Sequence, residues 1–490
     1  MVACVAAASM WAVQVNNTAG NLANLVDDTS ITSLTITGTI DARDFKFIAD
    51  KLNNLTLLNL SNAEVVAYDA KSPLFMEITA YESQAIPATS LMGKKLRSVN
   101  LPEGLTKIDM AAFAGCQQLE YLTLPSTLEV IEPYAFSACN KLKSLTLPAG
   151  IKELGEGAFS RCNELKTVTI NPTNSFTVGK DAFQDCSKLA SATLGDNVTE
   201  IGPGAFSGCT ALKSVKLNSS SNLTSIAEAA FAASGVEDMA LNKCSNLTTV
   251  GMWAFANTPL KNVTLPSSLE SLGDGAFYYN TNLENIDLPS NITSISNYLL
   301  AGDNAVDVEQ PVKDGVTSIG DYAFYNWDQI RDFVFPESVE YVGTKAMAGQ
   351  TSLEIVEAQS STVPALGDSV WAGVDQPSVP LKAPNDAVND YKEAEQWKEF
   401  AIYEIPTSID KEIADDTQVK AYFSGTMLNV TASKAIAKVS IFDTNGVLLS
   451  TASPAREQAQ LNTSNFAGKL YIVHVILDNG TKRTFKLVRQ

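Results

Sequence analysis

Apolar residues recur along this chain with a period of about 23 residues. The segment LPEGLTKIDMAAFAGCQQLEYLTL, which begins at Leu101, returns as LPSTLEVIEPYAFSACNKLKSLTL from Leu124 and as LPAGIKELGEGAFSRCNELKTVTI from Leu147. Each unit contains a short alternating stretch such as LEYLTL, which predicts a β-strand, and an Ala-Phe pair after a second short apolar stretch. A fixed period in this range predicts a solenoid whose coils pack only on their neighbours.

The Phe of the Ala-Phe pair marks the register from coil to coil. It occurs at Phe113, Phe136, Phe159, Phe183, Phe206, Phe231, Phe255, Phe277 and Phe324. The last interval leaves room for one degenerate coil with Leu300 at the Phe position, and Met347 and Trp371 hold this position in the last two coils. We therefore expect about twelve coils, each with a short strand and a short helical turn at the Ala-Phe pair, stacked at the inter-strand spacing of about 4.8 Å.

The segments outside the regular coils predict caps and a second domain. Residues 16–90 predict an N-terminal cap with a short helix at 21–26, a strand at 30–38, an amphipathic helix at 42–52 and a strand at 55–61. Residues 91–405 predict the solenoid, which ends in an amphipathic cap helix at 384–400 with Ala387, Tyr391, Ala394 and Trp397 on its apolar face.

After Ile405 the composition changes. Residues 406–417 are polar and acidic, which predicts a linker. Residues 418–490 consist of short alternating strands, and two Asn-Gly pairs, at 445–446 and 479–480, predict hairpin turns. This pattern predicts a small antiparallel β-sandwich.

The repeat pattern LPxxLxxIxxxAFxxCxxLxxLxL, over residues 91–375, resembles the BspA-like (LRR_5 type) leucine-rich repeats of bacterial cell-surface proteins. The opening TAGNLANLV…ITSLTITGTIDARDFKFI and the closing VPLKAPNDAVNDYKEAEQWKEFAIYEI resemble the first and last units of that family. The run KVSIFDTNGVLLS…GKLYIVHVILDNGTKRTFKLV resembles the C-terminal sorting domain of type IX secretion cargo. These resemblances imply a protein that is secreted or displayed on the outer membrane of a Gram-negative bacterium, with residues 418–490 engaging the secretion machinery.

Charge and composition exclude several classes of function. The chain has 35 Lys and Arg against 54 Asp and Glu, a net charge of −19, so binding to nucleic acid or to an anionic membrane surface is disfavoured. Residues 1–15 resemble the remnant of a signal peptide, with lipidation of Cys4 as the alternative. No other segment has the roughly 18 apolar residues that would span a bilayer, so we expect no membrane insertion.

The cysteines are the strongest candidates for chemistry. Cys116, Cys139, Cys162, Cys186 and Cys209 recur in register with the repeat. A metal site or stacked disulfides are the alternatives, but ligands arranged in a line do not converge on one ion, and five equivalent thiols do not pair evenly. We expect a ladder of small buried hydrophobes. Cys244 departs from this ladder, in a loop position where a free surface thiol is possible.

No constellation of residues predicts catalysis. The single histidine, His474, alternates with apolar residues on a strand of the terminal domain, which indicates a strand-face residue. Acidic pairs are expected on a solvated face. We therefore expect no catalytic, cofactor or metal site.

The remaining candidate is a surface made by the outward residues of successive strands. These residues are mostly small hydroxyl or amide side chains on a predicted concave sheet, and solenoids bind partners on such faces; the alternative is that Ser and Thr simply favour exposed strands. The candidate partner-binding residues are Tyr121, Thr123, Ser144, Thr146, Thr167, Thr169, Ser191, Thr193, Ser214, Lys216, Asn262, Thr264, Asn285 and Asp287.

Together these features favour a monomeric, non-catalytic, adhesin-like binding protein that recognises host extracellular or bacterial surface proteins or glycans. A structural spacer or assembly component of the cell surface is the alternative, and an enzyme is a distant third.

Overall fold

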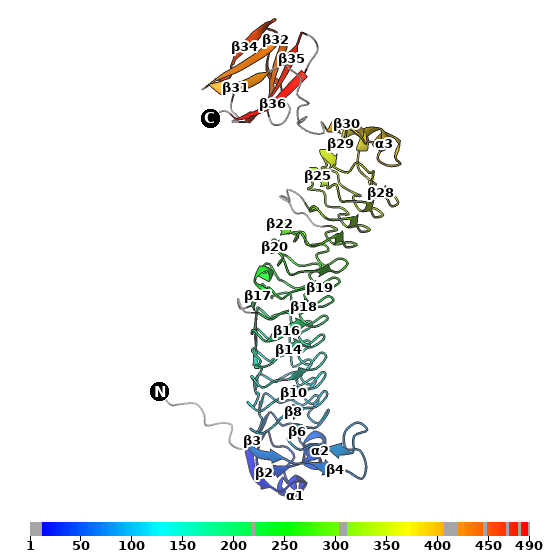
Figure 1. Cartoon of the computed structure of the whole chain (residues 1–490). Coiled ribbons are helices and arrows are strands. Elements are labelled where there is room, and N and C mark those ends of the chain that lie inside the picture. Colours follow the sequence, from blue (N-terminus) through cyan, green and yellow to red (C-terminus); the bar gives the residue numbers. More distant parts are fainter. Residues whose placement is uncertain are drawn as a thin grey trace. The chain divides into compact units, whose positions relative to one another are not determined.

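The computed structural model describes residues 12–217, 221–302, 311–405, 419–424, 426–443, 448–466, 470–478 and 482–488. The chain divides into two compact units, one ending at Glu404 and the other beginning at Ile405. The first unit is a solenoid with its caps, and the second is an antiparallel β domain (Figure 1). Within the described ranges, no helix is long and apolar enough to cross a membrane.

The first strands of successive coils pair in parallel, except at the breaks that divide the series into separate sheets. These strands carry alternating buried and outward side chains, because successive residues of a strand face opposite sides of the sheet. Four parallel sheets result, with the strands β1 (Ala12–Asn17), β2 (Ser33–Ile40), β3 (Leu57–Val65), β7 (Ser98–Asn100) and β9 (Tyr121–Thr123); β11 (Ser144–Thr146), β13 (Thr167–Ile170), β15 (Ser191–Leu194) and β17 (Ser214–Leu217); β20 (Asn262–Thr264) and β22 (Asn285–Asp287); and β25 (Asp332–Phe335), β27 (Ile355–Ala358), β29 (Pro380–Pro384) and β30 (Ala401–Ile405).

A second short strand in each coil forms a second series of parallel sheets. Their strands are β6 (Ala85–Ile86), β8 (Lys107–Ile108), β10 (Val130–Ile131) and β12 (Glu153–Leu154); β14 (Phe176–Val178), β16 (Val198–Ile201), β18 (Ser225–Ile226), β19 (Thr249–Val250) and β21 (Ser271–Leu272); and β23 (Ser294–Ile295), β24 (Ser318–Ile319), β26 (Tyr341–Val342) and β28 (Ala365–Leu366). The series is interrupted between β12 and β14 and again between β21 and β23.

The Ala-Phe segment of each coil forms consecutive turns. The Ala112 N–H donates within its own coil, to Asp109 O at 3.2 Å, whereas the Phe113 N–H donates to Ala135 O of the next coil at 2.8 Å. The sequence predicts a short helical turn here. Turns form instead because alternate N–H groups are directed at the neighbouring coil and cannot make the i→i−4 bonds of a helix.

The core of the solenoid is a ladder of stacked rings, as the spacing predicts. Phe113 and Phe136 stack with ring centroids 4.9 Å apart, and Phe159 and Phe183 with centroids 5.8 Å apart. The ladder continues to Phe277. Leu300, Met347 and Trp371 are buried at the same position in the coils that lack Phe.

The N-terminal cap is built on the strands β1, β2 and β3 and the helices α1 (Leu22–Leu25) and α2 (Ala42–Lys51). Asp41 caps the N-terminus of helix α2: its carboxylate accepts the Arg43 N–H at 2.9 Å, and Asp44 completes a capping box. The buried Asp44 carboxylate also accepts the backbone N–H groups of Gly20 and Leu22. The loop after β3 contains a small antiparallel pair, β4 (Tyr68–Asp69) and β5 (Ala80–Tyr81).

One predicted boundary is wrong at this end. The composition of residues 12–15 assigns them to a leader, but they form most of β1, whose backbone pairs with β2 from Ala12↔Ser33 to Asn17↔Gly38. A paired strand is part of the folded cap. Residues 1–11, including Cys4, lie outside the described residues.

The C-terminal cap helix is shorter than predicted. Instead of spanning 384–400, α3 covers Val388–Glu393, and the 3-10 turn η2 (Gln376–Ser378) precedes it. The helix ends because Ala394 is extended and Gln396 has a φ of +64°. Tyr391 and Trp397, on the predicted apolar face, are buried.

Gln396 leaves the helical conformation to close the last coil. The Val370 N–H donates to its side-chain oxygen at 2.8 Å, and its side-chain N–H donates to Gly367 O at 2.7 Å. In the preceding coil, the equivalent N–H, that of Ala346, donates directly to the equivalent backbone oxygen, that of Gly343, at 3.2 Å. The Gln396 amide therefore lies between a donor and an acceptor that bond directly to each other in the preceding coil, and in this way it ties the cap to the last coil.

The second unit is an antiparallel sheet of six strands with a core of its own. The strands are β31 (Lys420–Ser424), β32 (Met427–Phe442), β33 (Leu448–Ala452), β34 (Arg456–Asn462), β35 (Leu470–Leu477) and β36 (Lys482–Val488). The long strand β32 pairs with β31, β33, β34 and β35, and its side chains Leu428, Val430 and Ile441 are buried. The linker at 406–417 and the two predicted Asn-Gly turns fall outside the described residues, wholly or in part.

Candidate functional site

The candidate site is the outward face of the first-strand sheets, which we call the β-face. It comprises the fourteen residues predicted from the sequence, here placed on β9, β11, β13, β15, β17, β20 and β22. Most of these side chains are exposed, and the exposed fraction of Tyr121 is 58%. Thr169, Ser191 and Thr193 are half-buried.

The strand register brings eight of these residues together in two rows. One row runs Ser144↔Thr167↔Ser191↔Ser214, and the other runs Thr146↔Thr169↔Thr193↔Lys216. The remaining six lie on neighbouring sheets: Tyr121 and Thr123 pair with β7, and Asn262 and Thr264 pair with Asn285 and Asp287. The β-face therefore contains one compact patch, mostly of hydroxyl groups, on β11, β13, β15 and β17. A separate patch of amide, hydroxyl and carboxylate groups lies on β20 and β22, and Tyr121 and Thr123 lie on β9.

A row of ion pairs borders the β-face. Glu120 bonds to Arg97 of the preceding coil and to Lys143 of the following coil. These bonds, of which the one from Lys143 has the larger effect, lower the pKa of the Glu120 carboxyl to about 2. Glu237 joins Lys213 at 2.8 Å in the same way. Sequence reasoning missed this row. Its signal in the sequence is the charge of the residue just before each outward pair, which is positive at Arg97, negative at Glu120 and positive at Lys143.

The cysteine ladder belongs to the core, as predicted. The five thiols are fully buried, and each donates to a backbone carbonyl of the preceding coil, for example Cys116 to Leu91 O at 3.1 Å. Burial raises the pKa of the Cys116 thiol to about 12, and the neighbouring backbone N–H groups only partly oppose this. Such thiols are poor nucleophiles and poor metal ligands because both roles require the thiolate.

Cys244 is also buried, so the prediction of a surface thiol is wrong. The irregular coil folds into a 3-10 turn, η1 (Leu241–Lys243), which directs the Cys244 side chain into the solenoid core. Burial raises its pKa as well. The departure from the repeat spacing therefore reflects a local change of backbone and not a change of exposure.

The other candidate groups do not assemble into a chemical site. His474 lies on the outer face of β35, opposite Ser440 and Thr484, and its ring lies 4.8 Å from that of Phe442. Across the part of the chain that the structure describes, no three His, Cys, Asp or Glu side chains come together as metal ligands would.

Comparison with known proteins finds a family profile that matches the coils. The profile of the BspA-type leucine-rich repeat region matches residues 84–213, 176–307 and 303–378, which together cover more than half of the chain. No curated protein matches the sequence.

Solved structures with similar coils come from several bacteria. A leucine-rich repeat protein from Bacteroides ovatus is 21% identical, with 69% of this chain and 91% of that chain covered and a TM-score of 0.47. A leucine-rich cell surface protein from Faecalibacterium prausnitzii is 23% identical, covering 57% and 84% of the two chains with a TM-score of 0.31. The pneumococcal vaccine antigen PcpA is 17% identical, covering 67% and 84% with a TM-score of 0.34.

Proposed function

Because this chain belongs to the family of BspA-type leucine-rich repeat proteins, we propose that it is a non-catalytic binding protein, secreted or displayed on the surface of a Gram-negative bacterium. In this proposal a monomer recognises host extracellular or bacterial surface proteins or glycans through the β-face. The observation that carries the proposal is the pair of registered rows of hydroxyl groups on β11, β13, β15 and β17. The core does not use these side chains, so they are available to a partner.

Arginine at the centre of the hydroxyl rows tests this role. Thr146 and Thr169 are neighbours in register, and the double variant Thr146→Arg/Thr169→Arg places two long charged side chains in the middle of the patch. We expect binding to matrix proteins or immobilised surface glycans to fall at least tenfold, because the partner would have to displace or desolvate both cations. Biolayer interferometry with the full chain measures this change.

A matched control uses the other sheet. Thr177 is exposed on β14, so Thr177→Arg adds the same kind of charge away from the β-face, and binding should be unchanged. Full binding by a folded Thr146→Arg/Thr169→Arg variant would exclude the β-face. If no partner is recovered and the protein self-associates in light scattering, the alternative of a structural spacer is favoured.

The terminal unit has a second proposed role, in export or anchoring. This proposal is supported by its resemblance to the sorting domain of type IX secretion cargo and by its separate core, which lets it fold as a unit distinct from the solenoid. Deleting residues 410–490 should abolish surface display in the native host and leave the protein in the periplasm, as judged by fractionation and surface protease digestion. Unchanged display would refute the role.

A further inference from the structure

Six aromatic side chains gather on the turn segments of four successive coils, on residues outside the β-face. We call this group, formed by Trp253, Tyr278, Tyr279, Tyr298, Tyr322 and Tyr325, the aromatic patch. The Tyr298 and Tyr322 rings stack with centroids 4.8 Å apart, and Tyr278 lies edge-on to Trp253 at 5.1 Å. All six side chains are at least partly exposed, Tyr279 at 52%. These rings therefore form a continuous surface and not part of the core.

The repeat itself shows that the fold does not require these rings. The residue before the Ala-Phe pair is Trp253, Tyr298 or Tyr322 here, whereas elsewhere it is most often small: Ala111, Gly157, Gly204, Ala229 and Gly275. The residue after the pair is Tyr278 or Tyr325 here and is small at Ala114, Ser137, Ser160, Ser207 and Ala232. A position filled by Gly or Ser in one coil and by Tyr in another is not determined by packing of the core.

Aromatic residues are also unusual just before the Ala-Phe pair because the backbone there has a positive φ. Trp253 and Tyr298 both have a φ of +56°, and Tyr322 has a φ of +57°. Bulky residues are uncommon in this left-handed region, because there the Cβ of an L residue comes too close to the following carbonyl oxygen. At Gly275, a Cβ would lie 2.1 Å from the Trp253 ring, so the glycine makes room for the indole to lie across the neighbouring coil.

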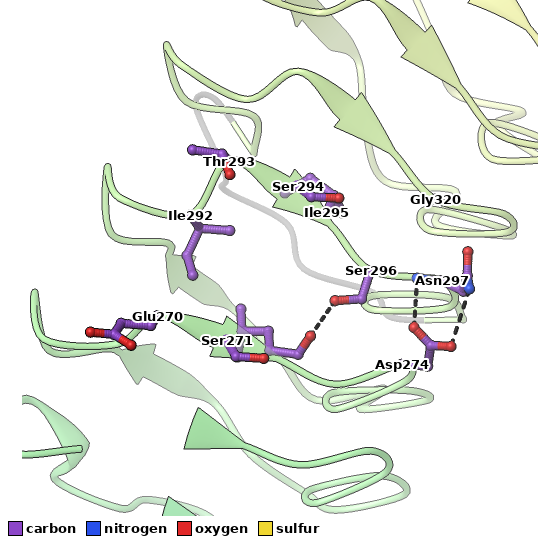
Figure 2. A pocket seen from close by; sticks show the side chains of 11 residues that line it. Glu270, Ser271, Asp274, Ile292, Thr293, Ser294, Ile295, Ser296, Asn297 and Gly320 are labelled. Atoms are coloured by element: carbon purple, nitrogen blue, oxygen red, sulfur yellow. Dashed lines mark hydrogen bonds between the residues drawn. The ribbon is translucent and has the colours of Figure 1, made fainter. Parts of the chain in front are cut away.

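A polar groove opens beside the aromatic patch, where the second-strand series is interrupted between β21 and β23. In flanking coils a backbone N–H bridges to the preceding coil at 2.8 Å, from Gly273 to Val250 O and from Gly320 to Ile295 O. At the equivalent position, the Ser296 hydroxyl donates to Leu272 O. The groove has a volume of about 360 Å³, and most of the side chains that line it are polar, although the apolar side chains of Leu272, Ile292 and Ile295 also line it (Figure 2).

The groove and the aromatic patch are continuous along the chain. Asp274 and Asn297 line the groove and are held together by two bonds, of 3.2 and 3.1 Å, from the Asn297 backbone and side-chain N–H groups (Figure 2). Asp274 immediately precedes Gly275, against which the Trp253 ring lies, and Asn297 immediately precedes Tyr298, so two rings of the aromatic patch lie next to the groove. A ligand that lies along the groove would therefore reach the rings.

The chemistry of this combined surface selects a class of ligand. Aromatic faces attract the weakly positive C–H groups of a flat ligand, and neighbouring hydroxyl, amide and carboxylate groups supply hydrogen bonds. The charged side chains that line the groove are Glu270 and Asp274, both acidic, so the groove would repel an anionic ligand even though Lys345 lies over the Tyr322 ring, 5.7 Å from its centroid. We propose that the groove and the aromatic patch together bind a neutral oligosaccharide, at a site separate from the β-face.

The test uses substitutions that the repeat already tolerates. In the variant Tyr278→Ser/Tyr298→Gly, each tyrosine becomes the residue found at the same position in other coils, as at Ser160 and Gly157. The full chain is titrated with cellohexaose, mannohexaose, maltohexaose and chitohexaose by calorimetry, and unfolding curves confirm that the variant is folded. We expect at least one hexasaccharide to bind, and the variant to bind it at least tenfold more weakly.

Two controls distinguish binding at the aromatic patch from binding elsewhere on the solenoid. Tyr134 occupies the position equivalent to Tyr298 in a coil outside the aromatic patch, so Tyr134→Gly should leave saccharide binding unchanged. The inference rests on the proposed function only in taking the chain to be a binding protein, and Thr146→Arg/Thr169→Arg should impair a β-face partner without affecting the hexasaccharides.

Three outcomes would overturn the inference. The first is that none of the four hexasaccharides binds. The second is that Tyr278→Ser/Tyr298→Gly binds as tightly as the native chain. The third is that decaproline or a heparin hexasaccharide binds at the aromatic patch and the neutral saccharides do not, which would assign the surface to a proline-rich peptide or to an anionic glycan.

Discussion

Replacing Phe159 with alanine should lower the free energy of unfolding of the solenoid by about 3–5 kcal/mol. The Phe159 ring is fully buried and stacks on Phe136 at 5.0 Å and on Phe183 at 5.8 Å. Its loss removes the apolar burial of one ring and leaves a cavity between two others. Because each coil packs only on its neighbours, the weakened contact is the one that joins the coils before Phe159 to the coils after it. Urea denaturation followed by circular dichroism measures the change.

The degenerate coil supplies the control for this variant. Leu300 fills the Phe position there and is fully buried, so the coil accepts a branched aliphatic side chain. Phe159→Leu should therefore cost clearly less than Phe159→Ala, because most of the volume is retained. Equal losses for the two variants would contradict the ring ladder as the source of stability.

Replacing Gly179 with alanine should lower the free energy of unfolding of the solenoid by about 1–3 kcal/mol. A Cβ at Gly179 would lie 1.9 Å from the Leu154 carbonyl oxygen of the preceding coil. The coils would have to separate locally, and the hydrogen bonds between them would weaken. The thermal unfolding midpoint, measured by differential scanning calorimetry, should fall accordingly.

Gly150 is a matched control for Gly179. A Cβ at Gly150 would be 3.8 Å from its nearest neighbour, Ser126 O, which is an ordinary contact. Neither glycine has a positive φ. Gly150→Ala should leave the midpoint unchanged or raise it slightly, since alanine restricts the unfolded chain. A fall of similar size in both variants would show that close approach of the coils is not the reason for glycine at 179.

The parts of the fold that depend on periodicity were predictable from the sequence. The interval between Phe residues predicts the ring ladder, and the alternation within each strand predicts which side chains point outward. The positions of Leu300, Met347 and Trp371 follow from the same count, and the structure confirms their burial.

The features that depend on contacts between coils were not predictable in this way. Gly155 has the sequence context of a turn residue, yet a Cβ there would lie 2.4 Å from the Pro133 nitrogen, so backbone approach is what excludes a side chain. The end of the cap helix depends on Gln396 bonding to a coil 26 residues earlier in the chain. Neither contact leaves a local signature in the sequence.

The aromatic patch was missed for a different reason. Its rings occupy three positions of the repeat in coils of unequal length, so they form no motif when the chain is read in order. The sequence signal is visible only when coils are aligned and the usual small residue is compared with Trp253, Tyr278 or Tyr298. Trp327, by contrast, attracts attention as an interruption, but it is fully buried at the position that Cys116 holds in its own coil.

The closing of the last coil by Gln396 bears on how this protein can evolve. The Gln396 amide bonds to Gly367 and Val370 of the last coil, so these two bonds do not depend on how many coils precede it. The units that contain Phe113, Phe136 and Phe159 share the same spacing of Leu, Ala-Phe and Cys positions, so a whole coil could be added or removed among them without changing the bonds of the Gln396 side chain. The solenoid can therefore change in length by steps of about 23 residues while its C-terminal cap is retained.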